Sequence, residues 1–279
     1  MSNILPEEKQ VAVLTALTEG CSIRSTERMM GVSQPTILSL LVRVGEGCAR
    51  LMDKRMRGLH CDRLELDEQW SFIAKKQRHV TEEDDPSVVG DVWLFVAIDA
   101  DTKLVPCYRV GKRDAENTNA FVADLTSRIQ PGRVQISTDG LSTYVEAVEL
   151  ALGARADFGQ IIKSFESEAI GPGRYSPPKV TAAEKFVIQG SPDVEKISTS
   201  YVERLNLTTR MQMRRYARLT NAFSKKPRNH RAAIGLHFAA YNFTRTHMTT
   251  RITAMGAGVT NRVWSMTDLL DAAIHGVCP

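Results

Sequence analysis

The sequence predicts a mixed α/β fold, in which a sheet flanked by helices follows a small all-α region. Residues up to about 58 carry apolar side chains at helical spacing, whereas segments from residue 62 onward alternate between polar and apolar side chains. After residue 62, a strand hairpin is followed by helix, strand and helix. That order is typical of a mixed sheet and excludes a simple helical bundle.

The overall composition is that of a globular protein. The chain has 279 residues, of which 43% are hydrophobic and 24% charged, so it is neither mostly disordered nor collagen-like. Its longest strongly apolar run, 92–98, is far shorter than the roughly 18–20 residues of a membrane span. The first residues show no basic stretch followed by an apolar one. We therefore expect a cytoplasmic protein with no membrane partner.

The cysteines and histidines argue against a zinc site. The five cysteines form no CxxC pair, and the six histidines form no HExxH motif. We expect free, buried thiols in a reducing compartment. Any bound metal would then be held by carboxylates, which favour Mg²⁺ or Mn²⁺. The chain also has no GxxxxGK[ST] loop, so no nucleotide cofactor is expected.

The N-terminal region predicts three helices. The first two cover 6–17 and 23–30, and the third follows Ser33, with Pro35 in its first turn, where a missing N–H costs nothing. The short connection between the last two is typical of a helix-turn-helix, which presents its final helix to a DNA groove. The outward side chains expected to contact DNA are Gln34, Thr36, Ser39 and Arg43. A plain three-helix bundle used for docking is the alternative, and the basic segment 50–59 is expected to be a linker.

The region after residue 62 predicts the sheet and its helices. The expected strands are 63–73, 91–98, 104–110 and 133–137, and the expected helices are 114–129 and 142–152. Residues 167–196 are rich in Gly and Pro, and we expect an irregular insertion with one short β-ribbon near 185–189. A C-terminal helix at 266–274 is expected either to mediate assembly or to dock on the core.

Three carboxylates are candidates for a metal site. Asp67 lies on the first expected strand, Asp139 follows the fourth, and Glu203 lies near the start of a helix that begins at about residue 198. Carboxylates gathered from neighbouring strand ends repel one another unless a divalent ion neutralises them. Because the chain has 32 acidic residues, each candidate taken alone is more simply a cap or a turn residue.

Other acidic residues compete for the same role. Glu65 shares the strand face of Asp67 and is the nearest rival, whereas alternation places Glu68 on the opposite face. Asp99 and Asp101 suit a hairpin turn, and Asp114 suits a helix cap.

A basic segment follows Glu203. Residues 201–231 hold nine Lys or Arg and a single acid, a net charge of +8 within a chain whose total is +4. On one continuous helix, Arg210, Arg214 and Arg218 would form a stripe next to Glu203. With Lys225 and Lys226, they are expected to hold a phosphate backbone beside the metal site. A basic surface helix without a site is the alternative.

Five motifs in order carry a family resemblance. They are LDEQWSF (66–72), AIDADT (97–102), STDG (137–140), YVERLNLT (201–208) and AFSKK (222–226). Together they closely resemble transposases of bacterial insertion sequences, of the insertion-sequence-one type. The resemblance implies an RNase H-like catalytic domain whose Asp-Asp-Glu triad matches Asp67, Asp139 and Glu203. Many relatives carry a cysteine-rich zinc ribbon ahead of the helix-turn-helix, and this chain has no such cysteines.

The resemblance also implies a reaction and a domain plan. Two Mg²⁺ or Mn²⁺ ions at the triad would support cleavage at the element end and attack by the freed 3′-hydroxyl on target DNA. We expect a dimer or higher oligomer on DNA, associated with the bacterial nucleoid. The expected domains are a helix-turn-helix at 1–58, a catalytic domain at 59–250 and a tail at 251–279. A nuclease of the same fold that cuts without joining, and a non-catalytic DNA-binding relic, remain as alternatives.

Overall fold

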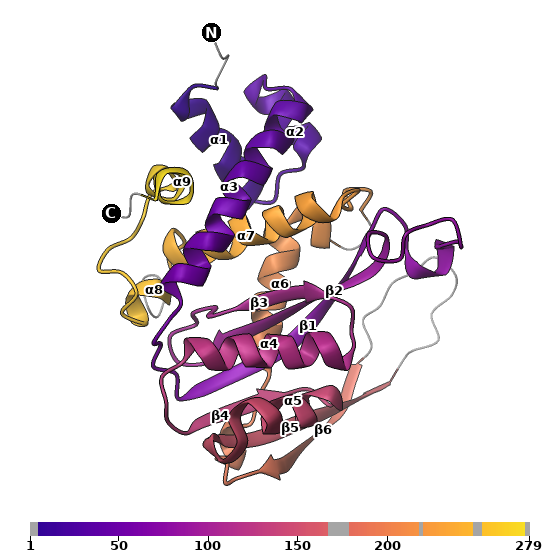
Figure 1. The fold of residues 1–279 in the computed structure, drawn as a ribbon, viewed down its shortest axis with the longest axis vertical. Helices are drawn as coiled ribbons and strands as arrows, with labels where there is room; N and C mark the ends of the chain where they lie inside the picture. The colour runs from indigo at the N-terminus through magenta and orange to yellow at the C-terminus, as the bar shows by residue number, and fades with distance from the viewer. Residues whose placement is uncertain (1–4, 167–178, 218–219, 248–252, 277–279) are drawn as a thin grey trace.

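A computed structural model describes residues 5–166, 179–217, 220–247 and 253–276 of the chain (Figure 1). Its three N-terminal helices are α1 (Glu7–Thr18), α2 (Ile23–Met30) and α3 (Gln34–Arg55). Ser22 begins α2 by accepting a hydrogen bond from the Ser25 N–H, and Gly31 ends it in the left-handed conformation at φ 62°. These helices form where the sequence predicts them.

Helix α3 is longer than expected. It continues to Arg55, so most of the segment 50–59 is helix and the prediction of a linker there is wrong. The reason is that Cys48, Leu51 and Met52 keep the helical spacing of the buried face, and all three are buried. The third helix is therefore one rigid rod of 22 residues.

A six-stranded sheet forms the centre of the molecule, in the order β3-β2-β1-β4-β5-β6. The strands are β1 (Arg63–Ile73), β2 (Gly90–Asp99), β3 (Tyr108–Gly111), β4 (Val134–Thr138), β5 (Ala156–Glu166) and β6 (Lys179–Gln189). Strands β1, β4 and β5 are parallel, whereas β2 is antiparallel to β1 and to β3, and β6 is antiparallel to β5. The first five strands have the order and directions of an RNase H-like sheet, so the predicted fold class is confirmed.

Helices cover both faces of the sheet. Helices α4 (Ala115–Arg128) and α5 (Thr143–Leu152) lie on one face, and α6 (Ser200–Gln212) lies on the other (Figure 1). The predicted cap Asp114 accepts a hydrogen bond from the Asn117 N–H at 2.9 Å. Asp99 accepts one from the Thr102 N–H at 3.1 Å within the predicted turn. Both residues therefore act as local structure, as expected.

Two strand predictions need correction. The third strand forms a ladder with β2 only over Tyr108–Gly111. Before it, the Leu104 and Cys107 carbonyls accept single hydrogen bonds from the Asp99 and Ala97 N–H groups at 2.8 Å and 3.3 Å, without a continuous ladder. The expected irregular insertion is also wrong over 179–189, which forms the full strand β6 and extends the sheet. Residues 167–178 lie outside the described part.

Helices α7 (Pro227–Phe243), α8 (Thr253–Gly256) and α9 (Met266–His275) complete the fold. Helix α9 buries Leu269, Leu270 and Ala273 against the rest of the protein, which is the docking alternative of the two predicted for it. Helices α3 and α7 cross in close contact, and their buried side chains belong to the same hydrophobic core as those of the sheet (Figure 1).

Within the described residues, none of the helices has the length and apolar character that crossing a membrane requires. Cys48, Cys61 and Cys107 are buried free thiols and Cys21 is half-buried. Cys278 lies outside the described residues. Burial raises the pKa of the Cys48 thiol to about 12, so it stays protonated and acts as an apolar side chain.

Candidate active site

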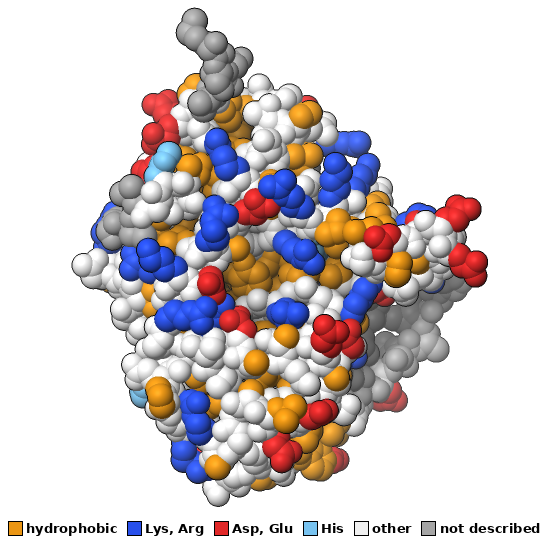
Figure 2. Space-filling model, viewed as in Figure 1, with side chains coloured by type: hydrophobic (Ala, Val, Ile, Leu, Met, Phe, Trp, Pro, Cys, Tyr) orange, Lys and Arg blue, Asp and Glu red, His pale blue; other side chains and the backbone are white. Residues whose placement is uncertain are grey.

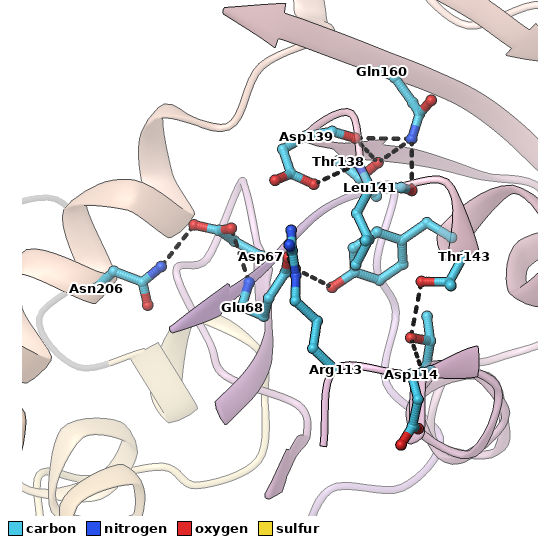
Figure 3. A network of polar contacts seen from close by, with 12 residues as sticks. Asp67, Glu68, Arg113, Asp114, Thr138, Asp139, Leu141, Thr143, Gln160 and Asn206 are labelled. Carbon is cyan, nitrogen blue, oxygen red and sulfur yellow. Dashed lines mark hydrogen bonds and ion pairs between the residues drawn. The ribbon is translucent and has the colours of Figure 1, made fainter. Parts of the chain in front are cut away.

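Strand register brings Asp67 and Asp139 together. Leu66 of β1 pairs with Thr138 of β4 in the parallel direction, and each aspartate is the next residue in the sequence, Asp67 within β1 and Asp139 just after β4. Because β4 ends at Thr138, the edge of β1 is open from Asp67 onward. Figure 3 shows the two carboxylates directed toward one another across this opening. Parallel strand ends of an open α/β sheet are a common place for ligand sites.

Glu68, which strand alternation predicts to lie on the opposite face, completes a cluster with the two aspartates. Oxygen atoms of Asp67, Glu68 and Asp139 all lie within 4.8 Å of one another. Alternation does send Glu68 to the opposite face, where its Oε2 accepts a hydrogen bond from Tyr144 of α5 at 3.2 Å. The prediction that this separates it from the site is wrong, because β4 has ended and a glutamate side chain is long enough to reach the shared opening.

Glu203 lines the same cleft from helix α6, on the face of the sheet opposite to α5. The cleft has a volume of about 440 Å³, and Asp67, Asp139 and Glu203 all contribute to its wall. The carboxylate of Glu203 accepts a hydrogen bond from Thr199 Oγ1 at 2.6 Å and forms an ion pair with Lys163 of β5. The structure thus gathers the three predicted carboxylates around one cavity, with Glu203 outside the tight three-oxygen cluster.

Glu65, the nearest rival, has a different role. It is 3% exposed, and its Oε2 accepts hydrogen bonds from the backbone N–H groups of Tyr201 at 2.7 Å and Val202 at 3.0 Å. These N–H groups belong to the first turn of α6, where no partner within the helix exists. Glu65 therefore fixes the start of the helix that carries Glu203, and its carboxylate is occupied by that contact.

Asn206 holds Asp67 from the same helix. Its Nδ2 donates a hydrogen bond to Asp67 Oδ2 at 2.7 Å, while Asp67 Oδ1 accepts the Glu68 N–H at 2.8 Å (Figure 3). Asn206 is in turn fixed by Gln69, whose Nε2 donates to the Asn206 carbonyl at 3.2 Å. Asn206 is not among the site residues predicted from the sequence. Its position three residues after Glu203, on the same helix face, was the available signal.

Asp139 is held by the turn that follows β4. Its Oδ1 accepts the Leu141 N–H at 3.0 Å, and Gln160 Nε2 donates to its backbone carbonyl at 2.8 Å (Figure 3). Gln160 pairs with Thr138 across β4 and β5, so the turn is anchored to the next strand. The aspartate side chain is thereby aimed into the cleft by a fixed backbone.

Burial, together with neighbouring negative charge, raises the pKa of two carboxylates in the cluster, Asp67 and Glu68. Burial raises the pKa of Asp67 to about 7, with further upward effects from Glu68 and Asp139, although the Glu68 N–H lowers it. The pKa of Glu68 is also raised, first by burial and then by Asp139, while the hydrogen bond from Arg113 lowers it. Buried carboxylates that repel one another fit a site that a divalent cation completes, and their oxygens are the ligands that Mg²⁺ and Mn²⁺ prefer.

Two basic side chains that were not predicted also line the cleft. They are Arg113, whose guanidinium lies 4.9 Å from the Trp93 ring centroid and donates to Glu68 Oε1 at 2.8 Å, and Lys163. No local pattern marks either residue, because each reaches the site through the order of the strands in the sheet. A cleft that offers both carboxylates and cationic side chains can hold a divalent cation next to an anionic ligand.

The predicted helix-turn-helix contacts are partly engaged within the protein. Thr36 and Ser39 are exposed on α3. Gln34 Nε2 donates to Glu27 of α2 at 2.5 Å, and Arg43 donates to Gln10 of α1 at 2.8 Å. These two bonds tie the three helices together, so Gln34 and Arg43 must exchange an internal partner for any external one.

The predicted arginine stripe on one long helix is wrong. Helix α6 ends at Gln212, Met213 leaves the helical conformation, and Arg214 lies in the separate short turn Arg214–Tyr216. The buried side chains Met213 and Tyr216 pull this turn onto the core, which breaks the helical spacing. Arg210 remains in the last turn of α6, and Arg218 lies outside the described residues. Lys225 and Lys226 are exposed immediately before α7.

Comparisons with known proteins give weak matches. No protein-family model matches the chain, and no curated protein sequence matches it. Among solved structures, a piggyBac transposase synaptic complex with hairpin DNA is similar at a TM-score of 0.41 and 10% identity, over 97% of this chain and 70% of that one. The Mos1 strand transfer complex is similar at 0.25 and 17%, over 55% and 57%. Similarity this low leaves the functional argument to the site itself.

Proposed function

We propose that the protein is a DNA transposase of the Asp-Asp-Glu type, which cleaves the end of a mobile element and joins it to target DNA. The observation that carries the proposal is the register of β1 and β4, which sets Asp67 beside Asp139 on a cleft also lined by Glu203. The insertion-sequence-one type, suggested by the five sequence motifs, is part of this proposal.

The proposed catalytic residues are Asp67, Asp139 and Glu203, which would hold two Mg²⁺ or Mn²⁺ ions. Such ions would activate water for attack on a phosphodiester and stabilise the leaving oxygen. The donor set fits, because each group is a carboxylate and at least Asp67 and Glu68 are crowded enough to favour a bound cation. Glu68 is either a further ligand of the cation or a neighbouring carboxylate that makes the electrostatic potential at the site more negative.

The surrounding residues position this chemistry. Glu65 anchors the start of α6, Asn206 orients the Asp67 carboxylate, and Lys163 neutralises Glu203. Arg113 lies on the cleft wall, where its guanidinium can bind a phosphate oxygen while it holds Glu68. These contacts support a site whose side chains are already held near one geometry.

The remaining expectations belong to the same proposal. Residues 1–58 would bind element DNA through the face that includes Gln34, Thr36, Ser39 and Arg43, followed by a catalytic region at 59–250 and a tail at 251–279. Arg210, Arg214, Lys225 and Lys226 would contact phosphates. A dimer or higher oligomer is proposed because two element ends must be joined, and a bacterial cytoplasm is the proposed setting.

The direct test uses a labelled element end, target plasmid and Mg²⁺ or Mn²⁺. Joined products support the proposal, whereas nicking without joining would favour a nuclease of the same fold. Binding without either reaction would favour the non-catalytic alternative. The matched variants Asp67→Asn and Asp139→Asn identify contaminating nucleases, since any product they retain does not come from this site.

A further inference from the structure

A second cleft lies between α3 and α7, apart from the carboxylate site. It has a volume of about 660 Å³, and its walls are formed by one face of α3 and the first turns of α7. The lining residues are Gly45, Glu46, Ala49, Arg50, Pro227, Arg228, Arg231 and Ala232. We call it the helix-crossing groove.

The floor of the groove is rigid because the two helix backbones touch. A Cβ on Gly45 would lie 2.1 Å from the Ala232 carbonyl oxygen, and one on Gly235 would lie 2.5 Å from the Gly45 carbonyl oxygen. Such close packing leaves the longer side chains on either side of the contact to form walls. The groove is therefore built into the core of the fold and does not depend on a loop.

The walls of the groove are basic. Arg50, Arg228 and Arg231 face a single acid, Glu46, which accepts hydrogen bonds from Arg228 at 2.6 Å and 3.0 Å. Among the described residues, neither Arg50 nor Arg231 forms an ion pair with a carboxylate. The groove also receives the N-terminal turn of the 17-residue helix α7, where unpaired N–H groups favour anions.

The groove continues the face of α3 that carries the predicted DNA contacts. Thr36, Ser39, Arg43, Glu46 and Arg50 are spaced alternately three and four residues apart, so they form one stripe along the helix. From Thr36 to Arg50 the helix rises about 21 Å, which is close to six base pairs of duplex. Figure 2 shows Lys and Arg side chains surrounding a hydrophobic hollow at the level where α3 crosses α7.

We propose that the helix-crossing groove binds the sugar–phosphate backbone of duplex DNA, with Arg50, Arg228 and Arg231 contacting phosphates. The duplex would run from the N-terminal part of α3 over the groove, toward the exposed Lys225 and Lys226. This inference rests on the proposed function for its choice of DNA as the polyanion. It adds a contact surface outside both the carboxylate site and the predicted recognition residues.

Glu46 has a specific place in this surface. In the free protein Glu46 forms an ion pair with Arg228. A phosphate that binds in the groove must therefore share Arg228 with Glu46 or displace the Glu46 carboxylate from it. The acid therefore lowers affinity for any polyanion while it keeps Arg228 aimed into the groove. Removing the charge of Glu46 should strengthen binding, which distinguishes a phosphate site from an ion pair that serves stability alone.

The test is DNA binding measured without divalent ions, so that no cleavage can contribute. The probe is a fluorescent mixed-sequence duplex, and affinity is measured across a salt series for the wild type and for Arg228→Ala with Arg231→Ala. Losing two phosphate contacts should reduce the slope of log affinity against log salt by roughly 2, and Glu46→Gln should raise affinity. The control is Arg133→Ala with Arg155→Ala, two arginines beside the starts of β4 and β5, which should leave the slope unchanged.

An unchanged slope in the groove variant, with native circular dichroism and wild-type DNA binding present, overturns the inference. Weaker binding by Glu46→Gln does the same. If the wild type binds DNA through the groove but yields no joined product, the inference about the groove holds and the proposed function is wrong. The two failures are therefore separable.

Discussion

Asn206 donates a hydrogen bond to Asp67, and it lies one helical turn beyond Glu203 on the same helix. Helix α6 thus carries the proposed metal ligand Glu203, and through Asn206 it also orients the carboxylate of Asp67 on β1. The position of α6 is set in turn by Glu65, two residues before Asp67 on β1. The two sides of the cleft are locked together by contacts among neighbours of the proposed catalytic residues.

Asn206→Ala should weaken metal binding and catalysis about 10- to 100-fold, because a residue that orients a metal ligand contributes on that scale. Mn²⁺ titration followed by product formation measures both effects. Thr208→Ala, on the same helix but half-buried away from the carboxylates, is the control. Equal activity in Asn206→Ala and the wild type at limiting Mn²⁺ would show that the bond to Asp67 has no positioning role.

Glu65→Ala should destabilise the protein by about 1–3 kcal/mol, because it leaves two N–H groups of the first turn of α6 without their buried acceptor. Urea unfolding measures this. Glu146→Ala removes an exposed acid from α5 and should stay within about 0.5 kcal/mol of the wild type. A Glu65→Ala protein as stable as that control would contradict the anchoring role.

Asp67→Asn should stabilise the metal-free protein at pH 8 while abolishing activity. The folded pKa of Asp67 is about 7 against an ordinary value of 3.8, so the folded state holds the proton more tightly than the unfolded state. The metal-free wild type therefore loses stability as the pH rises from about 4 to about 7, and the neutral amide does not share that loss. Thermal unfolding in chelator at pH 5 and pH 8 compares the two proteins, and a larger pH-dependent loss in Asp67→Asn would contradict the account.

Mg²⁺ should reverse this pH effect in the wild type. A cation that binds only the folded protein stabilises it by RT ln(1 + [Mg²⁺]/Kd), and Kd falls as Asp67 loses its proton. The melting temperature should therefore rise with Mg²⁺ at pH 8 and respond less at pH 5. Asp67→Asn and Asp139→Asn should respond weakly at both values, and a full response in either would remove that residue from the metal site.

Most helices and strands up to residue 152, and all three proposed ligands, were predicted from local patterns, whereas β5, most of β6 and helix α7 were not. Asp67 and Asp139 could be predicted because strand ends and a turn glycine are visible in the sequence. Glu68 could not, since alternation describes the direction of a side chain and not the point at which the neighbouring strand ends. The break after Gln212 was hidden as well, because Met213 and Tyr216 keep helical spacing while packing on the core in another conformation.

The basic surface shows the same limit. Counting charges located the excess of positive charge in residues 201–231. The predicted stripe of arginines needed one continuous helix, but α6 ends at Gln212. Arg228 and Arg231 instead meet Arg50, which lies more than 170 residues earlier in the chain. These arginines lie together because α3 and α7 cross at Gly45. Contacts between helices that are distant in the sequence cannot be predicted from the residue spacing within either helix.

The central claim is that Asp67, Asp139 and Glu203 perform phosphoryl transfer on DNA. The most direct measurement is joining of a pre-cut, labelled element end to a target plasmid in Mn²⁺, comparing the wild type with Asp139→Asn, whose DNA affinity is measured in parallel. The account predicts joined products for the wild type, and DNA binding without products for Asp139→Asn. Joining at the wild-type rate by Asp139→Asn would contradict it.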